Sequence, residues 1–238
     1  MKHCFVWAAA LLLALPACKK DDEPLNDDNQ NNTPGQTTPE ELQTIPDDME
    51  KAFPDPLFRA YVLNNFDTDG DGRISPEEAE TVTGIEVSSN YYMSASEKIG
   101  SLEGVQYFTR LTDLSCNYNQ LTELDLSRNT ELTTLYCTDN RLTTLDLSGC
   151  AALTSLDCSS NRLTALDVSG CPELTSLYCA DNQLTTLNVS HNPALTSLYC
   201  PMNPLETLIL KTGQSIEYIT YDRSKFFIPD ETKLEYVD

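Results

Sequence analysis

The chain has 238 residues, of which 37 are acidic and 15 are basic, so its formal net charge at pH 7 is −22. This excess of negative charge repels nucleic-acid phosphates and anionic lipid headgroups. We therefore expect no nucleic-acid partner, and any membrane attachment has to come from a source other than basic side chains.

Residues 1–18 have the pattern of an export signal. A polar start precedes an apolar run over residues 5–15, which is too short to span a bilayer as a stable helix. The run ends in Leu15-Pro16-Ala17-Cys18. This ending resembles the lipobox of bacterial lipoproteins, and the resemblance implies removal of the signal and lipidation of Cys18. The alternative is an ordinary signal peptide in which Cys18 is incidental.

Residues 19–50 are predicted to form a flexible acidic tether. They are rich in Asn, Asp, Gln, Thr and Pro and contain few large apolar side chains, so they cannot bury enough surface to offset the entropy of ordering. The charged start at residues 19–23 resembles the tag of Gram-negative lipoproteins that reach the outer face of the outer membrane. The resemblance implies a lipid-anchored, cell-surface location.

Residues 51–81 are expected to form a helical cap around a calcium loop. Residues 56–66 have apolar side chains at helical spacing, and residues 67–78 resemble the twelve-residue loop of an EF-hand. The resemblance implies structural calcium, with Gly72 in the sharp turn and Ile74 in the core. Its ligands would be Asp67, Asp69, Asp71, Arg73 through its carbonyl, Ser75 and Glu78. The alternative is an Asp- and Gly-rich turn that binds no ion.

An internal repeat determines the predicted fold. Five leucines stand 21 residues apart, and each opens the pattern L-x-x-L-x-C-x-x-N-x-L; they are Leu111, Leu132, Leu153, Leu174 and Leu195. This pattern resembles the leucine-rich repeat. The resemblance implies a β-rich solenoid over residues 82–215, in which stacked 21-residue coils form a parallel concave sheet. Residues 216–238 are expected to be a C-terminal cap that covers the last sheet edge.

Each coil contains two candidate strands, and an asparagine column decides between them. The first half of each coil is always followed by asparagine, at Asn119, Asn140, Asn161, Asn182 and Asn203. A buried turn asparagine can both donate to and accept from backbone groups of neighbouring coils. The first half is therefore predicted to be the main strand, and the second half is expected to contain extended or short helical turns.

The cysteines are interpreted as core residues. Cys116, Cys137, Cys158, Cys179 and Cys200 occupy one repeat position, where a thiol packs as a small hydrophobe. Cys150 and Cys171 share a second position, and a disulfide between them stays open as an alternative. No C-x-x-C pair occurs, which argues against a zinc site.

A row of side chains on the predicted concave face is the candidate binding surface. Tyr136, Asp157, Tyr178 and Tyr199 occupy equivalent outward positions of successive coils. Tyrosine is favoured at interfaces, although it is also a good strand residue that can be copied with the repeat. A second row, of Asp125, Asp146, Asp167 and Asn188, is interpreted as solvated turn residues.

No nucleophile with a base, paired carboxylates outside the repeat register or phosphate loop is found, so no enzymatic activity is expected. The sequence favours a monomeric cell-surface lipoprotein that binds a protein or glycan through its repeats. The alternative is a non-catalytic accessory of a surface polysaccharide-uptake system.

Overall fold

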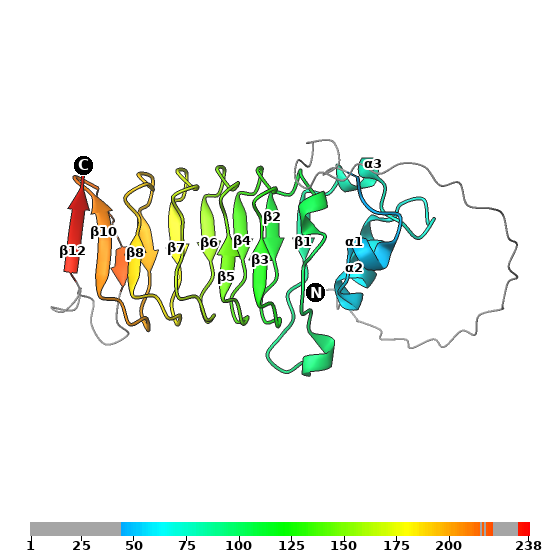
Figure 1. Cartoon of the computed structure of the whole chain (residues 1–238), viewed down its shortest axis with the longest axis horizontal. Helices are drawn as coiled ribbons and strands as arrows, with labels where there is room; N and C mark the ends of the chain where they lie inside the picture. Colours follow the sequence, from blue (N-terminus) through cyan, green and yellow to red (C-terminus); the bar gives the residue numbers. More distant parts are fainter. Residues whose placement is uncertain (1–43, 215, 217, 221–232) are drawn as a thin grey trace, which may run out of the picture. The chain divides into compact units, whose positions relative to one another are not determined.

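A computed structural model describes residues 44–214, 216, 218–220 and 233–238. The predicted export signal, Cys18 and residues 19–43 of the predicted tether lie outside the described residues. The described part is a solenoid of parallel coils preceded by short helices (Figure 1). This architecture confirms the predicted fold class.

The N-terminal helices are α1 (Met49–Ala52), α2 (Pro56–Phe66) and α3 (Pro76–Ala79). Helix α2 has the bounds expected from the apolar spacing, and the Asp55 side chain caps it by accepting from the amides of Leu57 and Phe58. The folded region begins before the predicted boundary at residue 51, because Ile45 is buried and α1 starts at Met49. The sequence could not predict this earlier start, because a single isoleucine in a polar stretch forms no periodic apolar pattern.

The helices pack onto the first coil through aromatic side chains. The rings of Phe53 and Phe58 lie 5.8 Å apart, and Phe66 and Phe108 lie 5.5 Å apart between centroids. Phe53, Phe58 and Phe108 are fully buried. The cap and the repeats therefore share one hydrophobic core.

The main sheet contains seven parallel strands in the order β1-β2-β4-β6-β7-β9-β11. These are β1 (Gly84–Glu86), β2 (Asp113–Ser115), β4 (Thr134–Tyr136), β6 (Ser155–Asp157), β7 (Ser176–Tyr178), β9 (Ser197–Tyr199) and β11 (Tyr218–Thr220). From β2 to β11 the register partners are 21 residues apart, so equivalent leucines such as Leu135 and Leu156 stack directly. The first half of each coil is thus the main strand, as predicted.

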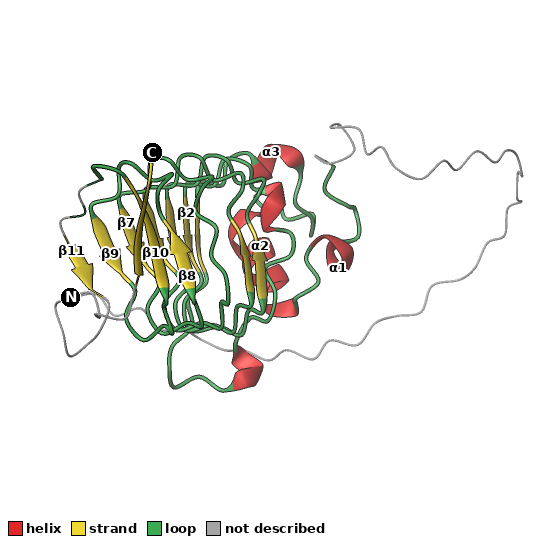
Figure 2. Cartoon of the chain, turned by 60° about the vertical axis from the view of Figure 1, so that its left-hand side comes forward, coloured by secondary structure: helices red, strands yellow, loops and turns green. Residues whose placement is uncertain are grey.

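The second halves of the coils form shorter parallel sheets (Figure 2). Strands β3 (Glu123–Asp125) and β5 (Thr144–Asp146) pair with each other. Strands β8 (Thr186–Asn188), β10 (Thr207–Lys211) and β12 (Lys233–Val237) form a second group. Residues 164–168, between these groups, form no strand. The second half is therefore extended, the first of the two conformations expected for it.

Two columns of side chains close the turns of each coil. Asn140 accepts from the amide of Leu121 at 3.1 Å and donates to the carbonyls of Cys116 and Cys137 at 2.9 and 3.1 Å. The other members of the asparagine column repeat these contacts. The residue before each of these asparagines has a positive φ, although none is glycine: Tyr118, Asp139, Ser160, Asp181 and Met202.

All seven described cysteines are buried and free. This confirms that Cys116, Cys137, Cys158, Cys179 and Cys200 form a core column, and it leaves Cys150 and Cys171 as separate thiols rather than a disulfide. The Cys150 thiol lies 3.4 Å from the carbonyl oxygen of Leu126. Cys150 and Cys171 belong to a second column, which follows the second half of each coil and also contains Asn129 and Asn192. The side-chain amides of these two asparagines donate to carbonyls equivalent to those near the thiols, so the cysteines replace asparagine in two of the coils.

The C-terminal segment extends both sheets. Strand β11 pairs with β9, and β12 pairs with β10 in parallel. The predicted residues 226–229 of the cap lie outside the described residues. Gln214 donates to the carbonyls of Val189 and Asn192, one residue after Gly213, which stands 21 residues after Asn192.

Candidate functional site

The predicted binding row lies on the face of the main sheet that points away from the core, which is the face predicted to be concave; we call it the outer face. We call the row the tyrosine row, and it consists of Tyr136, Asp157, Tyr178 and Tyr199. Register pairs link these residues in order along β4, β6, β7 and β9. The side chains of Tyr136 and Tyr178 are 41% and 37% exposed, whereas Asp157 and Tyr199 are half-buried. The rings of Tyr178 and Tyr199 lie 6.1 Å apart between centroids. The four side chains therefore form one continuous surface.

Further carboxylates, Asp139 and Asp181, flank the tyrosine row at the turns that follow β4 and β7. Burial raises the pKa of Asp139, and the negative charges of Asp181 and Asp157 add to this increase. Lys98 and a hydrogen bond with Tyr118 partly oppose it. Sequence reasoning missed Asp139 and Asp181, although both immediately precede a column asparagine and could have been found by their spacing. Together they make this side of the main sheet acidic.

Exposed tyrosines also occur on an insertion that the sequence reading did not single out. The register partners in β1 and β2, Gly84 and Asp113, are 29 residues apart instead of 21. The additional residues form a loop that includes the 3-10 helix η1 (Ala95–Glu97). At its start, Tyr91 and Tyr92 are 79% and 93% exposed, and their rings lie 5.7 Å apart. The 29-residue spacing between these two strands, visible in the sequence, could have indicated the insertion.

The predicted calcium loop brings three of its carboxylates together. Oxygen atoms of Asp67, Asp69 and Asp71 lie within 4.8 Å of one another. Gly70 and Gly72 have φ values of 76° and 82°, a conformation that favours glycine. Their amides donate to Asp67 at 2.7 and 2.9 Å. The loop can thus hold several hard oxygens around one point, which is the donor set that calcium requires.

The fourth predicted carboxylate ligand, Glu78, is not part of that cluster. Glu78 is buried and accepts from the amide and hydroxyl of Thr68 and from the amide and hydroxyl of Ser75. These hydrogen bonds, first that of the Ser75 amide, lower the pKa of Glu78 to about 2. Glu78 therefore stays ionised and ties the two ends of the loop together. Ser75 caps α3, Ile74 is buried as predicted, and the Arg73 side chain pairs with Asp47 at 3.0 Å.

The coil geometry and the asparagine column define a leucine-rich-repeat solenoid. Residues 130–171 and 151–191 match the family model for leucine-rich repeats, which describes two copies of the repeat. The matched stretch includes β4 to β8 and lies wholly within the stacked coils.

Over its repeats the chain is similar to proteins of Listeria monocytogenes. It is 41% identical over 78 residues to internalin J of serotype 4b (strain F2365), which is 33% of this chain and 8% of internalin J. It resembles the solved functional domain of InlJ, which includes a cysteine ladder, with 38% identity and a TM-score of 0.58 over 68% of this chain and 37% of that one. The chain is thus homologous to internalins but spans only a small part of internalin J.

A second solved internalin, inlF of strain 4b F2365, has a TM-score of 0.54 at 24% identity, covering 68% of this chain and 51% of that one. At this identity the likeness shows the fold alone. The leucine-rich-repeat family and the similar structures indicate no enzymatic family.

Proposed function

We propose that the chain is a non-catalytic binding module that takes a protein partner on the outer face of its main sheet. The tyrosine row is the observation that carries this proposal. Tyr136 and Tyr178 expose large amphipathic rings from short strands that the core holds in fixed register. Rigid aromatic side chains lose little entropy on binding, which makes them effective interface anchors. Homology to internalins over the repeats supports this role.

The proposal includes attachment at the cell surface. The support is in the sequence: the lipobox-like ending at Cys18 and the charged residues 19–23 that follow it. None of the helices in the described part of the chain has the length and apolar character needed to cross a membrane. We propose that a lipid on Cys18 anchors the protein in the outer membrane and that the acidic tether separates the solenoid from the bilayer.

We also propose that calcium binds the loop at residues 67–78 in a structural role. The convergence of Asp67, Asp69 and Asp71 supports this assignment. When bound, the ion would neutralise their mutual repulsion and stiffen the connection between α2 and α3. Glu78 would contribute mainly through its hydrogen bonds to Thr68 and Ser75, which connect the two ends of the loop.

The binding proposal is tested by site-specific photo-crosslinking. A benzophenone side chain is placed at position 178 of the full chain, and for comparison at Tyr236, an exposed tyrosine on β12. We expect discrete protein adducts on intact cells or host extracts from position 178 and not from position 236. Changing Tyr136 and Tyr199 to Ser should reduce the adduct formed at position 178 at least tenfold. Equal labelling from both positions, or adducts that survive these substitutions, would place the binding surface elsewhere.

The same experiment separates the two functions that the sequence favours. A polysaccharide-uptake accessory would yield crosslinks to saccharide and to no protein. A protein ligand yields a band of defined mass that proteases remove and glycosidases do not.

A further inference from the structure

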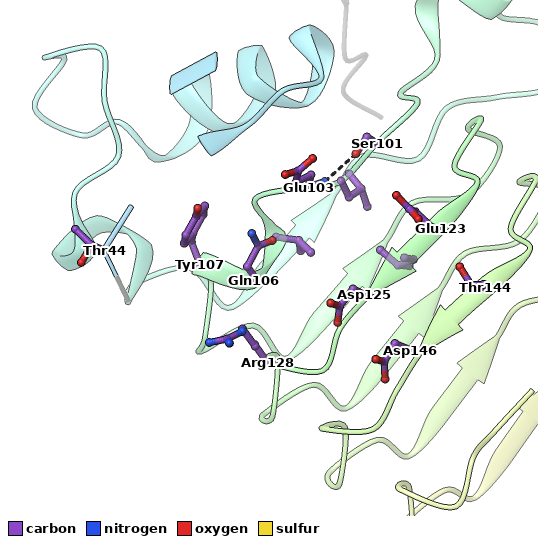
Figure 3. A pocket seen from close by; sticks show the side chains of 13 residues that line it. Thr44, Ser101, Glu103, Gln106, Tyr107, Glu123, Asp125, Arg128, Thr144 and Asp146 are labelled. Atoms are coloured by element: carbon purple, nitrogen blue, oxygen red, sulfur yellow. Dashed lines mark hydrogen bonds between the residues drawn. The ribbon is translucent and has the colours of Figure 1, made fainter. Parts of the chain in front are cut away.

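A hollow lies away from the tyrosine row, between residues 101–107 and the second-half strands β3 and β5. Its volume is about 600 Å³, which lies within the roughly 300–1,000 Å³ typical of sites for small ligands. One wall is formed by β3 and β5, and the other by the 3-10 helix η2 (Val105–Tyr107) and the loop before it (Figure 3). Thr44, which precedes α1, is the one lining residue from the N-terminal region.

The walls combine acceptors, donors and an aromatic ring. Asp125 and Asp146 stand on neighbouring strands, and Arg128 lies in the turn after β3 (Figure 3). Among the described residues Arg128 forms no ion pair. Gln106 and Tyr107 line the opposite side. Gln106 accepts from the amide of Gly104 at 2.8 Å and hydrogen-bonds to Tyr107, so the Arg128 guanidinium is the charged donor of the hollow that remains available.

The two aspartates are held in a fixed orientation. They are register partners on parallel strands, which are about 4.8 Å apart. Oδ1 of Asp125 accepts from the amide of Ser127, and Oδ1 of Asp146 accepts from the amide of Ser148, both at 2.9 Å. Oδ2 of Asp125 accepts no hydrogen bond from the described residues, whereas Asp146 also bonds to the side chain of Ser148. The hydrogen bonds of Ser148 also lower the pKa of Asp146, which keeps this acceptor ionised at neutral pH.

The aromatic wall is rigid. The ring of Tyr107 packs edge-on against Phe53 with 5.8 Å between centroids, and Phe53 is fully buried. Burial, aided by the charge of Glu103, raises the pKa of Tyr107, so its hydroxyl remains a hydrogen-bond donor. A flat, fixed ring beside oriented polar groups suits a ligand that has both an apolar face and a rim of hydroxyl groups.

The charges exclude other ligand classes. Within the part of the chain that the structure describes, only Asp67, Asp69 and Asp71 bring three possible ligand atoms within 4.8 Å, so the carboxylates of the hollow do not converge on a metal ion. Anionic ligands would meet the carboxylates of Glu103, Glu123, Asp125 and Asp146. A simple cation would leave the donors of Arg128 unused and would lie beside its positive charge.

We propose that this hollow binds a neutral saccharide, with Asp125 and Asp146 accepting from its hydroxyl groups, Arg128 donating to its oxygens and Tyr107 packing against a sugar ring. The site is independent of the tyrosine row, because none of its residues belongs to the main sheet. A chain that binds a protein on one sheet can therefore bind a glycan at the other.

The test is a titration of the full chain with neutral trisaccharides of α- and β-linked glucose, mannose, xylose and N-acetylglucosamine, followed by calorimetry and NMR. We expect at least one of them to bind with a dissociation constant in the micromolar to millimolar range. Asp146→Asn and Arg128→Met should each weaken that binding at least tenfold without lowering the melting temperature. Asp157→Asn is the matched control, because Asp157 accepts from the amide of Ser159 in the same way but lies on the main sheet.

Three results would overturn the proposal. The first is that no trisaccharide binds, and the second is that binding is unchanged in both variants of the hollow. The third is that spermine or a lysine-rich peptide binds in an Asp146-dependent manner while the sugars do not. Loss of sugar binding in Asp157→Asn alone would assign the saccharide to the tyrosine row instead.

Discussion

The side-chain amide of Asn161 donates a hydrogen bond to the backbone carbonyl of Cys137, which lies in the preceding coil, at 3.0 Å. The same side chain accepts from the amide of Leu142 at 3.0 Å and also donates to the carbonyl of Cys158. One buried side chain therefore satisfies backbone groups of two coils. These groups have no water to bind and would be costly to leave without partners.

Asn161→Ala should lower the free energy of unfolding by roughly 3 kcal/mol, because it leaves several buried backbone groups unsatisfied at once. Urea denaturation followed by circular dichroism measures the change. Asn188→Ala is the control: Asn188 is exposed and accepts only from Ser190, so we expect a loss below about 1 kcal/mol. Equal losses in the two variants would contradict this role of the column.

The buried thiols should make the protein sensitive to alkali. Burial, with smaller contributions from neighbouring charges, raises the pKa of Cys150 to about 12 and that of Cys171 to about 11. Burial also raises the pKa of Cys116 and Cys158. An unfolded thiol titrates near pH 8.5, so the unfolded state loses its protons first as the pH rises. The folded-state contribution is complete below about pH 8.5 and is lost as the pH approaches 11 to 12, by up to about 1.4 kcal/mol per pH unit for each thiol.

Unfolding curves between pH 7 and 11 measure this loss. Cys150→Ala should make the pH dependence shallower. At pH 8, alkylation mapped by mass spectrometry should leave all seven described cysteines unmodified in the native protein and modify them in guanidinium. A peptide containing Cys150 linked to Cys171 would show that the bridge forms after all.

Two equivalent glycines should differ in their tolerance of alanine. A Cβ added at Gly149 would overlap the carbonyl oxygen of Ser127, whereas at Gly170 the nearest atom, the carbonyl oxygen of Ser148, would be 3.2 Å away. We expect Gly149→Ala to lower the free energy of unfolding by about 2 to 3 kcal/mol and Gly170→Ala by about 1 kcal/mol or less. Thermal melts of the two variants side by side give the comparison, and a larger effect at Gly170 would refute it.

Calcium should stabilise the helical cap. With a dissociation constant near 10⁻³ M, about 10 mM calcium would add roughly 1.4 kcal/mol to the stability of the bound region. Amide exchange of α2 with and without calcium reports this locally. The double variant Asp67→Asn and Asp69→Asn should abolish the protection, while Glu77→Gln, an exposed neighbour outside the cluster, should retain it. Protection that persists in the double variant would remove calcium from this loop.

The sequence predicted the main sheet because the same residue types recur at one spacing. Leu135, Cys137 and Asn140 each have an equivalent 21 residues later, and the register follows from stacking like on like. For the second half of each coil the sequence left two conformations open, since residues such as Thr144 and Asp146 are common in turns as well as in extended chain. Their conformation depends on pairing with the neighbouring coil, which no local pattern shows.

Features that depend on tertiary packing could not be predicted from the sequence. The burial of Ile45 depends on the position of the cap, and the hollow beside Tyr107 depends on how residues 101–107 pack beside β3 and β5. The tyrosine row was predictable as a row, because its members are equivalent in every coil. The different exposure of Tyr178 and Tyr199 was not, since it depends on the neighbours of each ring.

Because neighbouring coils pair in a constant register, the number of coils can change without changing how each coil packs on the next. Every strand of the main sheet from β2 to β9 meets its neighbours through the same set of bonds. Duplication of one 21-residue segment of the gene would therefore lengthen the sheet by about 4.8 Å without creating a new kind of contact. Unequal recombination would in this way change the area of the main sheet while the N-terminal cap stays the same.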